Sequence, residues 1–149
     1  MTNKECTLIQ DMKAQEQVCA ETYTRHAQAA KDPQLKTLFE EQAATERHHL
    51  DLLTQMENGT VPFVDQAKIQ KPKTFSGTYG NAADPDKAND EYLCRDLLAA
   101  EKHASSLYDT CIFEFTDQGA REVLNYIQKS EQFHGKELYD YMSANGMQA

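Results

Sequence analysis

The sequence is built on an internal repeat, because its two halves align without a gap at an offset of 85 residues. In each half, a Glu is followed 30 positions later by a Glu-x-x-His motif. The identical pairs are Leu8/Leu93, Asp11/Asp96, Ala14/Ala99, Glu16/Glu101, Tyr23/Tyr108, Asp32/Asp117, Glu46/Glu131, His49/His134 and Leu53/Leu138. Any fold of this chain must therefore contain two equivalent units, each with the same acidic and imidazole side chains at the same positions.

Helix-breaking residues are few, with 6 Gly and 4 Pro in 149 residues, and most of them lie at the ends of long uninterrupted segments. An N-cap residue followed by Pro typically starts a helix, whereas Asn-Gly typically ends one. These signals occur at Asp32-Pro33, Asp84-Pro85, Asn58-Gly59 and Asn145-Gly146. Together with a short turn at 116–119, they predict four helices, at about 3–30, 33–57, 85–115 and from that turn to about 144.

Two helices joined by a few residues must lie antiparallel. The chain is therefore predicted to be one all-α domain, 1–149, with a helical hairpin at 3–58, a connection at 59–84 and a second hairpin at 85–145. An extended connection of about 25 residues easily spans the ~40 Å length of such helices, so a crossover is permitted. The prediction is a four-helix bundle of two antiparallel hairpins with a long crossover connection. We expect the connection to be held by Val61, Phe63, Ile69, Phe75 and Tyr79.

The Glu residues of the repeat fall on the apolar stripe of each predicted helix. The four stripes read Ile9-Met12-Glu16-Cys19-Tyr23, Phe39-Gln42-Glu46-His49-Leu53-Met56, Cys94-Leu97-Glu101-Ala104-Tyr108-Cys111-Phe115 and Leu124-Ile127-Glu131-His134-Leu138-Tyr141. The midpoints of the Glu pairs fall in the two hairpin turns, so both members of a pair lie roughly 22 Å from their turn. Within Glu-x-x-His, both side chains share one helix face. All six groups are thus predicted to meet at one level inside the bundle.

Four ionised carboxylates at one level of a core would be strongly destabilising, through desolvation and mutual repulsion. Two divalent cations would bring four carboxylates and two neutral imidazoles to zero net charge. One Glu from each of two helices and a Glu-x-x-His from each of the other two is the ligand set of carboxylate-bridged dinuclear sites. Oxygen and nitrogen ligands of this kind suit iron or manganese, and zinc can substitute. The predicted ligands of the two metal ions are Glu16, Glu46, His49, Glu101, Glu131 and His134.

With these motifs, both hairpins of the chain resemble the ferritin-like di-iron and di-manganese carboxylate proteins. The roles that this resemblance implies are bridging carboxylates at Glu46 and Glu131, terminal carboxylates at Glu16 and Glu101, and terminal imidazoles at His49 and His134. It also implies a reaction with dioxygen or peroxide.

A closer resemblance, to the spore coat protein F family of spore-forming bacteria, lies in the second hairpin. It rests on the stretch Asp-Leu-Leu-Ala-Ala-Glu-Lys-His at 96–103, on Tyr108, on Ile-Phe-Glu-Phe at 112–115 and on Tyr-Met-Ser-Ala-Asn-Gly-Met at 141–147. Membership implies deposition around the spore, with other spore coat proteins as partners. Many such coat proteins lack a full ligand set, whereas this chain has all six residues.

Tyr23 and Tyr108 lie seven residues after the first Glu of their half and on the same face. They are candidates for hydrogen-bond donors to the ligands or for redox-active phenols, but the favoured interpretation is ordinary core tyrosines. Asp11 and Asp96 could orient the imidazoles, and a solvated face is favoured for them.

The charge balance limits the classes of partner. Lys and Arg total 15 against 24 Asp and Glu, for a net charge of -9. A surface of that sign repels phosphate groups, so we expect neither nucleic acid nor membrane as a partner. The chain opens without a secretory signal pattern, so we expect cytoplasmic synthesis, followed by the spore coat if the family resemblance holds.

Two functions follow from these features, and the sequence leaves open whether the chain is an enzyme. The first is a dinuclear Fe or Mn centre with peroxidase, catalase or ferroxidase chemistry on peroxide or dioxygen. The alternative is a structural spore coat component whose metal site is vestigial or only stabilises the fold. Iron storage is a weaker third option. An apolar connection lying on the surface favours a homodimer.

Overall fold

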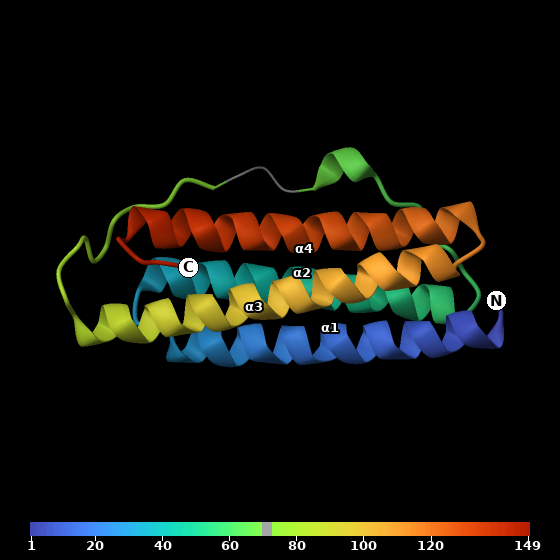
Figure 1. The fold of residues 1–149 in the computed structure, drawn as a ribbon, viewed down its shortest axis with the longest axis horizontal. Helices are drawn as coiled ribbons and strands as arrows, with labels where there is room; N and C mark the ends of the chain where they lie inside the picture. The colour runs from blue at the N-terminus through green and yellow to red at the C-terminus, as the bar shows by residue number, and fades with distance from the viewer. Residues whose placement is uncertain (70–72) are drawn as a thin grey trace.

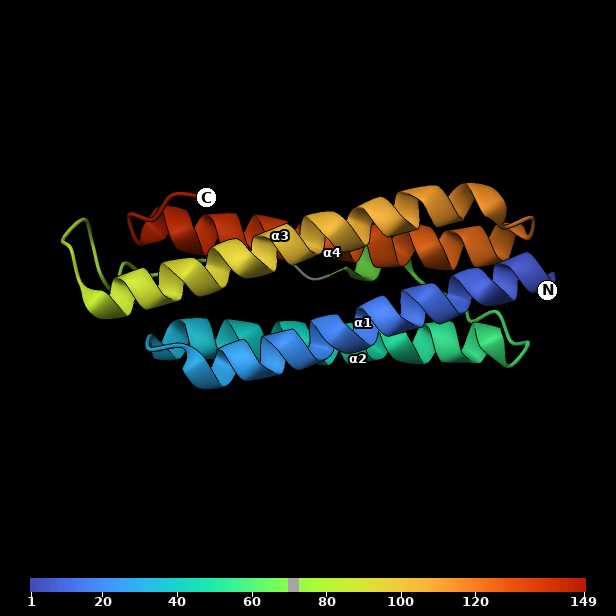
Figure 2. The ribbon, with the colours of Figure 1, turned by 60° about the horizontal axis from the view of Figure 1, so that its bottom comes forward.

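The computed structural model describes residues 1–69 and 73–149 as a bundle of four long helices (Figure 1). Helix α1 spans Asn3–Ala29, α2 Pro33–Glu57, α3 Pro85–Glu114 and α4 Gln118–Ala144, and a short 3-10 helix, η1, spans Gln66–Lys68. The helices pair as two antiparallel hairpins, α1 with α2 and α3 with α4, which lie against each other as two layers (Figure 2). The predicted all-α fold with a long crossover connection is confirmed.

The predicted capping signals act at the helix starts. The Asp32 carboxylate accepts a hydrogen bond from the Gln34 amide at the start of α2, and Asp117 accepts one from Ala120 at the start of α4. Pro33 and Pro85 occupy the first positions of α2 and α3, where the missing N–H leaves no hydrogen bond unmade. Because these local bonds satisfy amides that a helix start leaves unpaired, the helix limits follow closely from the sequence.

Each hairpin turn is also held by a carboxylate from the other hairpin. Asp90, in the first turns of α3, accepts hydrogen bonds from the Lys31 and Asp32 amides at 2.8 and 2.9 Å. Glu5, in the first turn of α1, accepts one from the Thr116 amide at 3.1 Å. Glu5 and Asp90 are 85 residues apart, so the repeat extends to this contact although the two residue types differ. The two hairpins therefore fix each other at both ends of the bundle.

The apolar core is divided into two clusters by a polar layer at mid-height. One cluster lies toward the turn between α1 and α2 and includes Phe39, Leu97 and Tyr141. The other lies toward the turn between α3 and α4 and includes Leu53 and Ile127. The polar layer is thus enclosed by packed side chains above and below, which keeps bulk water from it along the bundle axis.

The connection between the hairpins runs along the outer side of α4 (Figure 1). Residues 70–72 of the predicted connection lie outside the described part of the chain. Phe75 and Tyr79 pack against the core, as expected, and Ile69 is half-buried.

The prediction for Phe63 is wrong, because this side chain is 91% exposed, and Val61 is also exposed. Successive side chains of an extended segment point to opposite sides. Val64 takes the inward position and packs against the second cluster, so Phe63 faces outward, whereas Val61 is part-exposed and lies beside Gly119 at the start of α4. Among the helices of the described residues, none has an apolar stretch of the length needed to span a membrane.

Candidate metal centre

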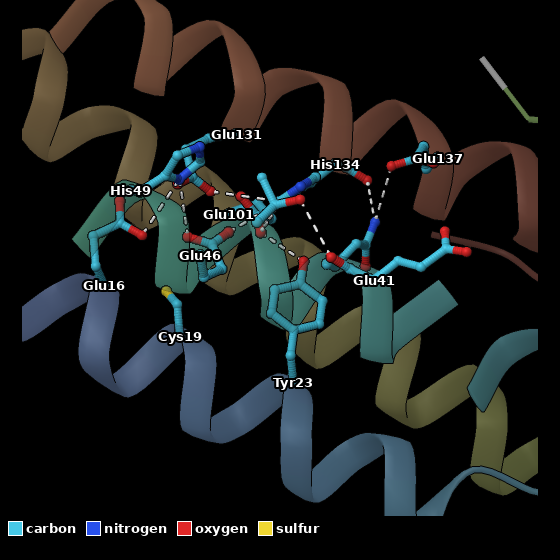
Figure 3. Close-up of polar contacts among 12 residues, drawn as sticks. Glu16, Cys19, Tyr23, Glu41, Glu46, His49, Glu101, Glu131, His134 and Glu137 are labelled. Atoms are coloured by element: carbon cyan, nitrogen blue, oxygen red, sulfur yellow. Dashed lines mark hydrogen bonds and ion pairs between the residues drawn. The ribbon is translucent and has the colours of Figure 1, made fainter. Parts of the chain in front are cut away.

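The polar layer brings together all six predicted ligand side chains. Glu16 comes from α1, Glu46 and His49 from α2, Glu101 from α3, and Glu131 and His134 from α4 (Figure 3). None of the six is more than 3% exposed. They form two sets, Glu16-Glu46-His49-Glu131 and Glu46-Glu101-Glu131-His134, and within each set the candidate ligand atoms lie within 4.8 Å of one another. Glu46 and Glu131 belong to both sets, so they lie between the other four.

In the first set, the His49 Nδ1 atom faces three carboxylates. It lies 3.0 Å from Glu131, 3.4 Å from Glu46 and 3.6 Å from Glu16. The nearest of these carboxylates comes from the other hairpin. The first set is therefore assembled only when the two hairpins pack against each other.

The second set repeats this arrangement in the other half. The His134 Nδ1 atom lies 3.0 Å from Glu46, 3.2 Å from Glu101 and 3.9 Å from Glu131. The two imidazole rings are nearly parallel, with their centroids 6.3 Å apart. The offset of 85 residues in the sequence thus corresponds to two facing half-sites in space.

Tyr23 and Tyr108 are core residues whose hydroxyl groups also form hydrogen bonds with carboxylates of the site. The Tyr23 hydroxyl donates to Glu101 at 2.5 Å, and the Tyr108 hydroxyl donates to Glu16 at 2.6 Å. Both tyrosines are fully buried. Each therefore reaches the carboxylate of the other hairpin rather than the Glu of its own helix. The sequence analysis named both tyrosines as candidate hydrogen-bond donors to the ligands but favoured ordinary core tyrosines, because spacing along one helix contains no information about the opposite helix.

Burial and mutual repulsion set the protonation of the carboxyl groups. Burial, with repulsion from Glu46, raises the pKa of Glu16 to about 7, and burial with the charges of Glu101 and Glu46 raises the pKa of Glu131 well above its usual range. Burial also opposes ionisation of Glu46 and Glu101. Even so, interactions with Glu16 and with the two histidines lower the pKa of Glu46 to about 2, and interactions with Glu131 and His134 lower the pKa of Glu101. Below about pH 7, two of the four carboxyl groups thus retain a proton.

The two imidazoles shift in the opposite direction. Burial alone would lower the pKa of His49, but its contacts with Glu16 and Glu46 raise it to about 9. Burial likewise opposes the charged form of His134, but its contacts with Glu101 and Glu46 raise the pKa of His134 to about 10. With both imidazoles charged, the site without ions is electrically neutral. Four protons then balance the charge that two divalent cations would balance.

The donor atoms fit a metal pair. In the described residues, the Oε2 atoms of Glu16, Glu101 and Glu131 are buried without a hydrogen-bond partner. Such atoms are costly in a core, and a cation in each ligand set would give them a partner. Carboxylate oxygens with imidazole nitrogens are the donors that suit iron, manganese and zinc.

The sequence analysis missed two buried polar residues beside the centre, Gln42 and Glu137. The Gln42 amide nitrogen lies 3.4 Å from the carbonyl oxygen of His134 and 3.5 Å from Glu137. Burial raises the pKa of Glu137. Its position three residues after His134, on the same helix face, is the signal that could have indicated it.

Other residues that the sequence analysis weighed lie away from the centre. Asp96 contacts His26 on α1, at 2.6 Å, and does not orient His49 or His134. Cys19 lies one turn from Glu16 (Figure 3), where burial raises the pKa of its thiol. It therefore packs as a small apolar side chain, as the sequence analysis expected.

Comparison with known proteins addresses the fold and the second hairpin. Residues 89–149, which include most of α3 and all of α4, match the family model of the Coat F domain. A solved structure described as a dodecameric thioferritin, the bacterioferritin-related protein from Bacteroides fragilis, aligns with a TM-score of 0.67 and 19% identity. The alignment covers 94% of this chain and 84% of that one. No curated protein matches the chain. This chain therefore has a ferritin-like four-helix bundle fold, and its residues 89–149 are similar to the Coat F domain.

Proposed function

We propose that the chain binds a dinuclear centre of iron or manganese in its core and that this centre reacts with peroxide or dioxygen. The observation that carries the proposal is the pair of buried ligand sets that share Glu46 and Glu131. A carboxylate placed between two sets can give one oxygen to each ion. Glu46 and Glu131 are therefore the bridging ligands in this proposal, and the four other residues are terminal ligands.

The protein residues hold the ligand atoms in place before any ion binds. Tyr108 engages Oε1 of Glu16 and Tyr23 engages Oε1 of Glu101, which leaves Oε2 of each carboxylate free for an ion. Such preorganisation by neighbouring hydrogen bonds is a usual support of metal sites. A bound iron or manganese pair would supply one- and two-electron chemistry. The two apolar clusters on either side would limit access of water to it.

Elemental analysis of the protein, purified without added metal and then supplied with iron or manganese, tests the proposal. We expect about two ions per chain, one for each ligand set. The metal-loaded protein should consume hydrogen peroxide, and a manganese pair can do so without an external reductant because peroxide dismutation is balanced in electrons. Zinc-loaded protein is the matched control, since zinc binds such ligands but has no redox chemistry. Less than one ion per chain under all these conditions would contradict the proposal.

Metal binding should also release protons and strengthen with pH. The centre without ions holds protons on both imidazoles and on two carboxyl groups, and ligation requires their removal. The folded-state pKa values of His49, His134 and Glu16 are raised to about 9, 10 and 7, so raising the pH through these values favours the metal form. We expect release of up to about four protons per two ions, measured with an indicator dye in weakly buffered solution. A proton count near zero would contradict the assigned protonation.

A structural role in the spore coat is the second candidate, and the match of residues 89–149 to the Coat F domain favours it. The centre would then be vestigial or would only stabilise the bundle. Full thermal stability after chelation, with no metal recovered from the protein, would favour this role over redox chemistry. The homodimer and the coat protein partners expected from the sequence stay predictions, and light scattering measures the first of them.

A further inference from the structure

A groove between α3 and α4 leads from the surface to the proposed metal centre. Its volume is about 820 Å³, within the usual range of small-molecule sites. Its floor includes the carboxylates Glu101 and Glu131, one terminal and one shared ligand of the centre. The groove therefore comes next to two ligand residues of the centre, although their side chains are only 3% and 1% exposed.

The equivalent groove of the first hairpin, between α1 and α2, does not reach them. It has about 500 Å³, and neither Glu16 nor Glu46 lines it. The repeat relates the two grooves residue by residue, so the side chains that differ can be identified. Arg47 of α2 donates a hydrogen bond to Thr24 of α1 at 2.6 Å and so bridges the two helices across the first groove, whereas the equivalent of Arg47 in the second hairpin is Gln132.

Gly135 is the clearest difference between the two hairpins. Its equivalent in the first hairpin is Leu50, which lines the narrower groove. A Cβ atom at position 135 would meet the Leu98 side chain at 3.6 Å, an ordinary contact. A methyl group therefore fits there, but a leucine side chain would extend into the groove above Glu131. Because Gly in the interior of a helix costs about 1 kcal/mol relative to Ala, the opening is made at some expense of helix stability.

The groove between α2 and α4 is a poorer route. It has about 370 Å³ and reaches His134, but none of the four carboxylates lines it. The groove between α3 and α4 also has polar walls, with the hydroxyl of Ser105 and the amides of Gln128 and Gln132. Lys102 and Lys136 lie at its exposed rim, but Lys136 is paired with Asp140 and Asp109 also lines the groove, so the rim carries charges of both signs. This lining suits a small polar molecule.

We infer that small oxygen- or nitrogen-donor molecules, with peroxide as the physiological class, reach the centre through the α3–α4 groove that Gly135 opens, since among the three grooves compared within residues 1–69 and 73–149 it is the one lined by carboxylates of the centre. The inference rests on the proposed function, since it gives the route of the substrate to that same centre. It goes beyond the ligand set, because the ligand set is nearly symmetric between the two hairpins whereas the proposed route of access is asymmetric.

Replacing Gly135 by leucine, the residue at the equivalent position of the first hairpin, should fill the groove and so tests the inference. Iron-loaded wild type, Gly135→Leu and Gly135→Ala are titrated with azide, a small anion that ligates ferric iron, and binding is followed by optical absorption. We expect Gly135→Leu to weaken azide binding by at least about tenfold while its iron content stays that of the wild type. Gly135→Ala controls for the loss of the glycine itself and should bind azide as the wild type does. Equal azide affinity in all three proteins would overturn the inference.

A second measurement on metal-free protein separates this inference from the proposed function. Carboxyl groups are labelled with a carbodiimide and glycine ethyl ester, and the labelled residues are identified by mass spectrometry. Because Glu101 and Glu131 are only 3% and 1% exposed, we expect their labelling to be slow in the wild type and in Gly135→Ala, and to be lost in Gly135→Leu. Labelling that is absent from the wild type, or unchanged by leucine, would overturn the entrance. If the chain binds no metal, the proposed function fails and this labelling alone decides whether the groove is open.

Discussion

Replacing Glu46 by Gln should abolish binding of both metal ions. Glu46 is shared by the two ligand sets, so its loss removes a charged ligand from each. Gln keeps the volume of the side chain, and the effect is therefore not that of a cavity. We expect at least about a 100-fold loss of affinity for each ion, because even residues that only support ligands are worth 10–100-fold. Elemental analysis after gel filtration, with peroxide consumption measured on the same samples, checks this result.

Two further variants give this prediction its controls. Glu16 belongs to one set only, so Glu16→Gln should retain about one ion per chain. Glu137 is buried on α4 close to the centre but belongs to neither set, so Glu137→Gln should bind as the wild type does. Equal metal content in the Glu46 and Glu137 variants would contradict a bridging role for Glu46.

Replacing Asp90 by Ala should destabilise the whole bundle, without any change at the metal centre. The Asp90 side chain is fully buried, and it accepts hydrogen bonds from the Lys31 and Asp32 amides and from the Tyr79 hydroxyl. Alanine leaves these donors without their partner, at a cost of about 1–3 kcal/mol for each buried group left unpaired. Since some of them will find water, we expect a loss of about 3 kcal/mol, or roughly 6–12 °C in the melting temperature.

The measurement is urea unfolding of metal-free protein, followed by circular dichroism. Asp86→Ala is the matched control, because Asp86 lies on the same helix one turn earlier and is exposed. Its free energy of unfolding should stay within about 0.5 kcal/mol of the wild type. A similar loss in both variants would indicate that the effect comes from the start of α3 and not from the contact with the turn.

Much of the ligand set could be predicted from the single sequence. Glu16 and Glu46 are equally far from the first hairpin turn, and Glu101 and Glu131 are equally far from the second. Because the rise per residue of a helix is constant, this predicts that all four lie at one level of the bundle. The apolar stripes predict that these groups face inward. The structure brings all six side chains together as expected. Whether ions bind there stays a prediction that elemental analysis decides.

The contacts across the two hairpins could not be obtained in this way. Tyr23 binds Glu101, Tyr108 binds Glu16, and Asp90 holds the turn at 31 and 32. Each contact joins residues that are far apart in the sequence. Periodicity describes one helix at a time, so it contains no information on which opposite side chain a given residue meets.

By itself, the sequence determined the four helices, their limits and the level at which the acidic groups lie, because capping and helical rise are local properties of the chain. Only the tertiary structure decided that side chains of one hairpin form hydrogen bonds with the other hairpin, that Phe63 faces outward, and that the groove beside Gly135 opens on one side of the centre. These features depend on how closely helices approach and which side chains fill the space between them. That balance of packing is settled by the whole fold, and no single segment contains it.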